Sequence, residues 1–246
     1  MLLPRALFLL CSVVGIAAQV SGAFRAPALP ILNGAVIPPA HSYLTVFPKA
    51  ESPISENGSW ITGGSVGLDW ADVQTRVGIA FGGRTSLQYA DPTAVLAGIW
   101  ASDQQVEGVV TVGQNASSCC REVELRLRTV IIAHAITGYE VLCSIVAEFP
   151  YIQIVRWNGP LGDFSYLGET KEGCRKGDVL KAVINDTRIV VYKNGNQVLE
   201  AVDDHFRNGN PGMGFYDTTQ GIWTKLGLQT DQDFGFARFS AADLAP

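Results

Sequence analysis

Hydrophobic and polar positions alternate over short distances from about residue 41 onward. The clearest alternation runs from Arg121 to Ile132, where charged and apolar residues take turns. Strict alternation places the two kinds of side chain on opposite faces of a strand, so this segment predicts a half-buried β-strand. One face carries Glu122, Glu124, Arg126 and Arg128, and the other carries Val123, Leu125 and Leu127.

A β-hairpin is predicted between residues 151 and 167. Two runs rich in β-branched and aromatic residues, 151–157 and 164–167, flank a cluster of turn-forming residues. Glycine and asparagine adopt backbone angles that strand residues avoid, so such a cluster favours a turn. The predicted turn consists of Asn158, Gly159, Pro160 and Gly162.

Further apolar runs predict a chain built almost wholly of strands. They recur at intervals of roughly ten residues with turn signals between them, and the only helical turn expected is at 203–207. This pattern is typical of an all-β protein, and we expect a two-sheet antiparallel jelly-roll sandwich occupying 41–246 as one domain. The other expected strands are 43–47, 60–61, 77–81, 94–100, 106–112, 139–146, 179–184, 188–192, 197–202 and 234–239.

The first 23 residues predict a secretory signal peptide. Arg5 precedes an apolar run from Ala6 to Ala18, and Ser21 and Ala23 offer a cleavage site. That run of about 13 residues is shorter than the roughly 20 that a membrane-spanning helix needs. We therefore expect an exported protein, either secreted and extracellular or periplasmic, with no transmembrane segment. The proline-rich stretch 24–40 is expected to be a leader before the domain.

The charge of the chain limits the classes of partner that it is expected to bind. The formal net charge is −5, and the basic residues of the 121–128 segment are interleaved with acids, which argues against a nucleic-acid partner.

Four cysteines follow the signal peptide, and an even number in an exported chain predicts disulfides. Adjacent cysteines rarely bond to each other, so the expected pairs are Cys119 with Cys143 and Cys120 with Cys174, or the reverse. The alternative is a single bridge or none. Asn57, Asn115 and Asn185 begin N-glycosylation sequons.

Several segments, taken in order, resemble a known family. They are Asn57-Gly-Ser-Trp60, Asp103-Gln104, Glu122-Val-Glu-Leu-Arg126, Gly138-Tyr-Glu140, 151–167, Gly177-Asp-Val179, Asn194-Gly195 and 209–215. Together they resemble exported jelly-roll domains of the concanavalin A-like lectin and glucanase superfamily, of the laminin-G-like type. The resemblance covers roughly residues 50 to 240 and is most specific at 151–167. It implies a two-sheet sandwich whose concave face or edge loops meet carbohydrate, but lectins, binding modules, hydrolases and lyases share this fold.

Two enzyme classes are considered as alternatives. Retaining glucanases of this superfamily carry a Glu-x-Asp-x-x-Glu strand, and that motif is absent here. The segment 122–126 resembles the Arg-Ser-Glu-Leu-Arg strand of alginate lyases, with Glu124 and Arg126 in matching positions but Glu122 in place of the first arginine. The resemblance makes Glu124, Arg126 and Tyr139 the candidate catalytic residues, and it ranks a polysaccharide lyase before a glycoside hydrolase. The simpler interpretation is that these acids pair with Arg126, Arg128 or a facing strand.

Carbohydrate binding requires only an aromatic plate and a few polar groups, so it is the predicted function. The candidate plates are Trp157, Tyr139, Tyr166 and Trp100, whereas Trp60, Phe215 and Phe239 are assigned to the core. Strand parity allows Trp157 or Arg156 on the binding face, but not both. The expected partner is an extracellular polysaccharide or glycan, and a structural or adhesion domain that binds protein is a further alternative. The predicted ligand-binding residues are Glu122, Glu124, Arg126, Gln153, Arg156 and Trp157.

No cofactor is predicted with certainty. Jelly rolls of this type often hold a structural calcium ion between their first and last strands, which the resemblance brings into consideration here. The candidate ligands are Asp231, Asp233 and Glu51. Calcium takes six to eight oxygen ligands, so three scattered acids give this site weak support.

Overall fold

The computed structural model describes residues 41–83, 91–113, 121–217 and 234–244, together with the backbone of 31–32 and 35–36. The predicted signal peptide lies outside these residues, as does most of the predicted leader. Within the leader, β1 (Ile31–Leu32) and β2 (Ala35–Val36) form a two-stranded antiparallel pair. Among the described residues, no helix combines the length and apolar character needed to cross a membrane.

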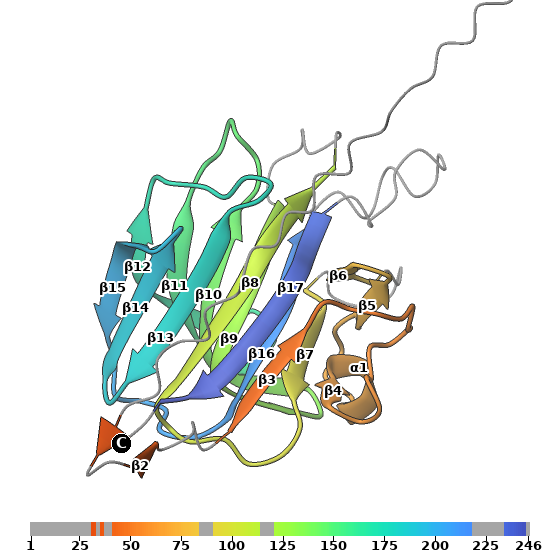
Figure 1. Cartoon of the computed structure of the whole chain (residues 1–246), viewed down its shortest axis with the longest axis horizontal. Coiled ribbons are helices and arrows are strands. Elements are labelled where there is room, and N and C mark those ends of the chain that lie inside the picture. Colours follow the sequence, from red (N-terminus) through yellow and green to blue (C-terminus); the bar gives the residue numbers. More distant parts are fainter. Residues whose placement is uncertain are drawn as a thin grey trace, which may run out of the picture. The chain divides into compact units, whose positions relative to one another are not determined.

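Residues 41–244 fold as two stacked antiparallel sheets, which confirms the predicted all-β jelly-roll sandwich (Figure 1). One sheet has seven strands, in the spatial order β12 (Phe164–Thr170), β11 (Ile152–Pro160), β10 (Ala135–Ser144), β9 (Arg121–Ile132), β16 (Asn210–Asp217), β7 (Thr93–Leu96) and β4 (Trp60–Thr62). The other has eight strands, in the order β15 (Asn196–Val202), β14 (Arg188–Lys193), β13 (Val179–Asn185), β8 (Gln104–Val112), β17 (Phe234–Asp243), β6 (Ile79–Gly82) and β5 (Val73–Arg76), with β3 (Ser42–Thr45) also paired to β17.

The main core lies between the two sheets. The apolar residues of the β9 alternation, Val123, Leu125 and Leu127, are fully buried there, as the sequence pattern predicts. Trp60, Phe215 and Phe239 belong to the same core, which confirms their assignment. The inner face of the seven-stranded sheet is therefore largely apolar, and Glu122, Glu124 and Arg126 of β9 point to its outer face.

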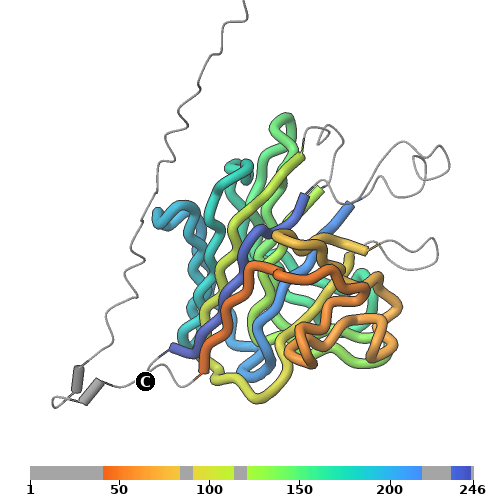
Figure 2. The backbone as a smooth tube through the Cα atoms, turned by 45° about the vertical axis from the view of Figure 1, so that its right-hand side comes forward, coloured from red at the N-terminus to blue at the C-terminus, as the bar shows by residue number. Residues whose placement is uncertain are grey.

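A second apolar cluster covers part of that outer face. The short helix α1 (Gly63–Val66) and the residues that follow it fold back over the sheet, where the orange segment in Figure 2 lies beside the green strands. Leu68 and Trp70 from this segment pack with Val155 and Trp157 of β11. This covering segment makes the outer face partly buried and shapes the hollow that remains.

A β-bulge interrupts the alternation of β9 at Arg128. Arg128 adopts a φ of 47°, and the pairing of β9 with both neighbours shifts register here. Its side chain turns away from the outer face and donates to the backbone oxygens of Ser102 and Phe206. The prediction that Arg128 shares a face with Glu122, Glu124 and Arg126 is therefore wrong, because a bulge shifts the parity of the strand.

The hairpin between β11 and β12 is tighter than predicted. Strand β11 continues through Asn158 and Gly159 to Pro160, and the turn falls at Leu161 and Gly162. Gly162 has a φ of 79°, which a residue with a side chain rarely adopts. The helical turn expected at 203–207 does not form; that segment is irregular.

The disulfide pairing differs from both predicted schemes. Cys143 at the end of β10 is bonded to Cys174 in the β12–β13 connection. This bond excludes the predicted partners of both cysteines, while Cys119 and Cys120 lie outside the described residues. Of the three sequon asparagines, Asn57 is exposed in a turn, Asn185 is exposed at the end of β13, and Asn115 is outside the described residues.

Candidate functional site

A pocket of about 180 Å³ opens on the outer face of the seven-stranded sheet. We call it the sheet-face pocket. It lies where β9, β10, β11 and β12 run side by side, and β16 beside β9 contributes Tyr216. Its walls combine carboxylates with aromatic rings, contributed by Asp91, Glu122, Glu140, Leu142, Gln153, Val155, Trp157, Phe164, Tyr166 and Tyr216.

A buried ion cluster lies at the base of this pocket. The Arg126 guanidinium, fully buried, pairs with Asp91 at 2.7 Å, with Glu124 at 2.6 Å, and with Glu140 on the neighbouring strand. Glu140 also accepts a hydrogen bond from the Trp157 indole nitrogen at 2.6 Å. Cross-strand pairing of Arg126 with Glu140 explains the contact, because opposite residues of an antiparallel pair lie on one face.

The cluster retains protons that exposed carboxyl groups would lose. Burial raises the pKa of Asp91 to about 7, although the charge of Arg126 opposes that rise. Burial likewise raises the pKa of Glu122 to about 8, against the effect of the hydrogen bond that Tyr151 donates. Burial and then the charges of Asp91 and Glu140 raise the pKa of Glu124 well above its ordinary value. At neutral pH the pocket therefore offers both carboxyl donors and carboxylate acceptors.

A metal ion fits this cluster poorly. Ligand oxygens of Asp91, Glu124 and Glu140 lie within 4.8 Å of one another, as a cation site requires. However, the guanidinium of Arg126 already occupies the space between them and supplies the compensating charge. The predicted calcium ligands do not assemble elsewhere in the described residues. Asp231 and Asp233 lie outside those residues, and the Glu51 carboxylate accepts the backbone N–H groups of Ser55 and Glu56.

A series of aromatic rings leads from the buried cluster to solvent. Trp70 meets Trp157 with ring centroids 4.8 Å apart, Trp157 meets Phe164 at 5.1 Å, and Phe164 meets Tyr166 at 5.3 Å. Exposure increases along the series: Trp157 is 4% exposed and Tyr166 is 65% exposed. Tyr166 therefore presents a ring at the pocket mouth that is held from behind by its neighbours.

Three of the predicted binding residues, Glu122, Gln153 and Trp157, line the pocket. Glu124 and Arg126 lie beneath it, paired and buried, so they shape its charge without reaching a ligand. Of the two residues that strand parity left open, Trp157 is the one on the pocket face. Arg156 points to the opposite face of the sheet and pairs with Asp203.

Two other candidates do not belong to the pocket. Tyr139 is buried on the inner face of the sheet, where its hydroxyl donates to Asp203 at 2.6 Å. Trp100 stacks on His41 with ring centroids 3.9 Å apart and does not line the pocket. Their selection as plates relied on residue type alone, which does not indicate the face of the sheet.

The sequence alone did not indicate Trp70 of the aromatic series or six residues of the pocket lining: Asp91, Glu140, Leu142, Val155, Phe164 and Tyr216. Glu140 had a usable signal, because the expected hairpin between the 121–132 and 139–146 strands places it near Arg126. Asp91 and Trp70 reach the site from segments far along the chain, and no local pattern identifies them.

Comparisons with known proteins bear on the fold. No protein-family model and no curated protein matches the chain. Among solved structures, the metal-free exoplasmic/lumenal domain of VIP36 matches with a TM-score of 0.53 and 12% identity, over 84% of this chain and 92% of that chain. The same domain with Ca²⁺ and Man3GlcNAc bound matches with a TM-score of 0.52 and 11% identity, over 83% of this chain and 91% of that chain. The carbohydrate-binding module CBM66 from Bacillus subtilis matches with a TM-score of 0.49 and 21% identity, over 67% of this chain and 91% of that chain.

These likenesses concern the fold. The chain shares its two-sheet jelly-roll fold with the VIP36 domain, and this confirms the fold that the resemblance implied. What the protein does must be argued from the site, because one fold supports several activities.

Proposed function

We propose that this protein binds carbohydrate in the sheet-face pocket and acts on a glycan or polysaccharide outside the cell. The observation that carries the proposal is the exposed ring of Tyr166 beside a pocket lined by carboxyl groups. A sugar ring offers an apolar face for such a plate, and its hydroxyls donate to carboxylates and accept from protonated carboxyls. Export is supported by the predicted signal peptide and by the disulfide, since such bonds persist in oxidising compartments.

Solved neighbours support the same proposal by analogy. The VIP36 domain has been solved with Man3GlcNAc and Ca²⁺ bound, and it shares this fold. For this chain we propose an uncharged sugar, because the described lining of the pocket contains acids and no cation. A carboxylate or sulfate on the ligand would meet like charge there, with the nearest arginine already paired to three acids.

A glycoside hydrolase is the second candidate, and it replaces the lyase as the leading enzymatic alternative. A lyase needs a cation that reaches the substrate carboxylate, and Arg126 is fully buried with its two terminal nitrogens paired to three carboxylates. A hydrolase needs a carboxyl that keeps its proton at neutral pH, and Glu122 meets that requirement at the pocket wall. Release of reducing ends from a neutral polysaccharide, abolished in Glu122→Gln, would support this candidate over simple binding.

The binding proposal is tested with a glycan array and affinity gels containing neutral and acidic polysaccharides. We expect retention by a neutral polymer, and Tyr166→Ala should weaken it roughly fivefold, about 1 kcal/mol, because a stacking ring is lost. Phe149→Ala removes another exposed aromatic ring, outside the pocket, and serves as the matched control. No array signal, or equal losses in both variants, would refute the assigned site.

A further inference from the structure

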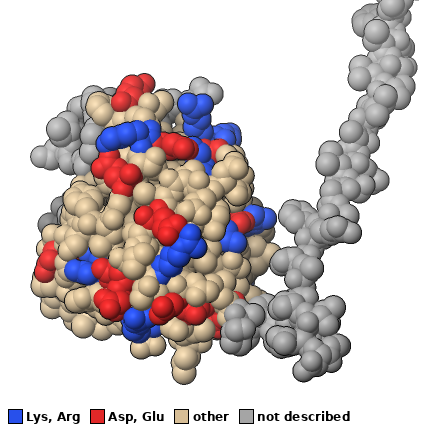
Figure 3. Space-filling view, turned by 90° about the vertical axis from the view of Figure 1, so that its left-hand side faces the viewer, with Lys and Arg blue, Asp and Glu red and all other residues tan. Residues whose placement is uncertain are grey.

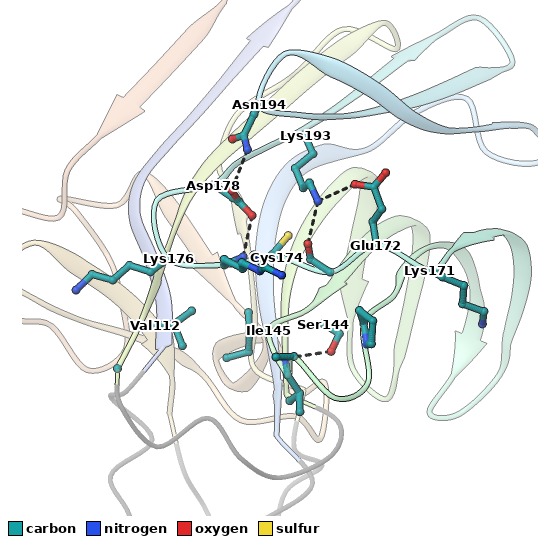
Figure 4. A pocket seen from close by; sticks show the side chains of 16 residues that line it. Val112, Ser144, Ile145, Lys171, Glu172, Cys174, Lys176, Asp178, Lys193 and Asn194 are labelled. Atoms are coloured by element: carbon teal, nitrogen blue, oxygen red, sulfur yellow. Dashed lines mark hydrogen bonds and ion pairs between the residues drawn. The ribbon is translucent and has the colours of Figure 1, made fainter.

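A second pocket, of about 660 Å³, lies at one end of the sandwich and shares no lining residue with the sheet-face pocket (Figure 4). We call it the end pocket. It is formed where the β10–β11 connection and the β12–β13 connection meet the last residues of β8 and the β14–β15 turn. Its walls thus come from both sheets.

The base of the end pocket is held rigidly. The disulfide between Cys143 and Cys174 joins β10 to the β12–β13 connection, and the Cys174 N–H donates to the Ser144 oxygen at 2.8 Å. Three residues later, the Gly177 N–H donates to the Val110 oxygen of β8, also at 2.8 Å. The connection is therefore tied to both sheets, and side chains projecting from it start from a fixed backbone.

The acidic groups of the end pocket already have partners. Glu172 pairs with Lys193 at 2.7 Å, as drawn in Figure 4. The Asp178 carboxylate accepts the Asn194 amide and the Arg175 backbone N–H, both at 2.8 Å. These acids are occupied within the protein and leave little negative charge facing the pocket.

The basic groups are in excess. Lys171, Arg175, Lys176 and Lys193 line the pocket against only Glu172 and Asp178. Among the described residues, no carboxylate pairs with the side chain of Arg175 or Lys176. Within the described part of the chain, Lys171 pairs with the exposed Glu169 alone, a contact that a stronger anion displaces at little cost. Figure 4 shows Lys176 and Lys171 extending on opposite sides of the pocket.

This excess is local. The protein as a whole has a formal charge of −5. Figure 3 shows acidic and basic side chains interleaved over one face, where neighbouring charges compensate each other. A basic hollow within an acidic molecule concentrates anions at that point.

We propose that the end pocket binds a linear polyanion, a sulfated or uronate-bearing polysaccharide. Unpaired cations within the pocket and lysines on either side of it suit a chain with regularly repeated negative charges that crosses the opening. A single small anion would engage one side only. The proposal does not depend on the sheet-face pocket, whose acidic lining disfavours a polyanion.

The test compares heparin, polygalacturonate and neutral dextran by affinity electrophoresis and titration calorimetry at 20 mM and 300 mM salt. We expect one or both polyanions to bind at low salt, with a strong loss of affinity at high salt because exposed charges are screened. Heparin carries sulfate groups and polygalacturonate carries only carboxylates, so the comparison of the two shows which anionic group the pocket prefers. Lys176→Glu should weaken binding at least about tenfold, whereas Lys49→Glu makes the same charge change at an exposed site outside the pocket and should have little effect.

Three outcomes would overturn the proposal: no polyanion binding at low salt, equal losses in Lys176→Glu and Lys49→Glu, or dextran binding that is also lost in Lys176→Glu. Tyr166→Ala separates the two sites, because polyanion binding should survive it. Since neither lysine variant touches the core, circular dichroism of each should match the wild type.

Discussion

Replacing Arg126 by methionine should destabilise the protein severely, and the loss should depend on pH. Methionine fills most of the space of the arginine stem but supplies no charge. Asp91, Glu124 and Glu140 would then share a buried site without the cation that pairs with all three. Removing one partner from a buried ion pair costs about 3 to 5 kcal/mol, because the remaining charge stays in a poorly solvated place.

The pH dependence follows from the protons that the remaining carboxyls bind. Without Arg126 the folded pKa values of Asp91 and Glu124 rise further, because the cation that lowers them is gone, while their unfolded values stay near the ordinary range. Each proton that the folded variant binds in excess lowers its stability by about 1.4 kcal/mol per pH unit as pH rises. Below about pH 4.5 the carboxyls become protonated in both states and the charge penalty fades, leaving about 1 to 2 kcal/mol for lost hydrogen bonds.

The assay is urea denaturation followed by tryptophan fluorescence at pH 4.5 and pH 7.5. Arg156→Met is the matched control, since that arginine is partly exposed and pairs with the single carboxylate of Asp203. We expect the control to lose less than half as much stability as Arg126→Met at pH 7.5. A loss in Arg126→Met that is the same at both pH values, or no greater than in the control, would refute the account of the cluster.

Three further outcomes are expected. Glu122 and Asp91 have folded pKa values of about 8 and 7, above their unfolded values, so their contribution is full below about pH 4.5 and is lost as pH rises through 7 to 8. Urea midpoints between pH 5 and 9 should therefore fall less steeply in Glu122→Gln than in the wild type; equal slopes would contradict the assigned pKa. Replacing Cys143 and Cys174 by alanine should cost about 3 to 4 kcal/mol, because the bond closes a loop with a sequence separation of 31, and an unchanged thermal midpoint would argue against the bond. Gly138→Ala should destabilise by about 1 to 3 kcal/mol, since a Cβ there would lie 2.6 Å from the Arg128 oxygen, whereas Gly159→Ala meets no atom within 4 Å and should cost less by the same thermal assay.

Much of the fold was predictable because the order of polar and apolar residues along a short segment is enough to indicate a strand. The segment 121–132 is predicted with the same bounds that β9 has, since alternation of charged and apolar residues indicates a strand. The alternation did not predict burial, because Glu124 and Arg126 on the charged face are buried too. The failure at Arg128 has an equally local cause. A bulge adds one residue to the count, and nothing in the charge pattern marks where that residue is inserted.

The site was less predictable because its members meet through tertiary structure. Trp157 and Gln153 follow from parity once the buried face is known, but Asp91 joins Arg126 across 35 positions of the chain. The disulfide illustrates the same limit. Counting cysteines indicates that bonds form, but only the placement of the β10 end beside the β12–β13 connection brings Cys143 to Cys174.

The position of β17 has a consequence for how the protein is made. This strand is last in chain order, yet it lies inside the eight-stranded sheet, between β8 on one side and β6 and β3 on the other. The ribosome synthesises residues in chain order. The edge of β8 that pairs with β17 therefore stays unpaired until Phe234 to Asp243 have left the exit tunnel. The sandwich therefore closes only after synthesis of its final strand, and exposed sheet edges must be shielded until then.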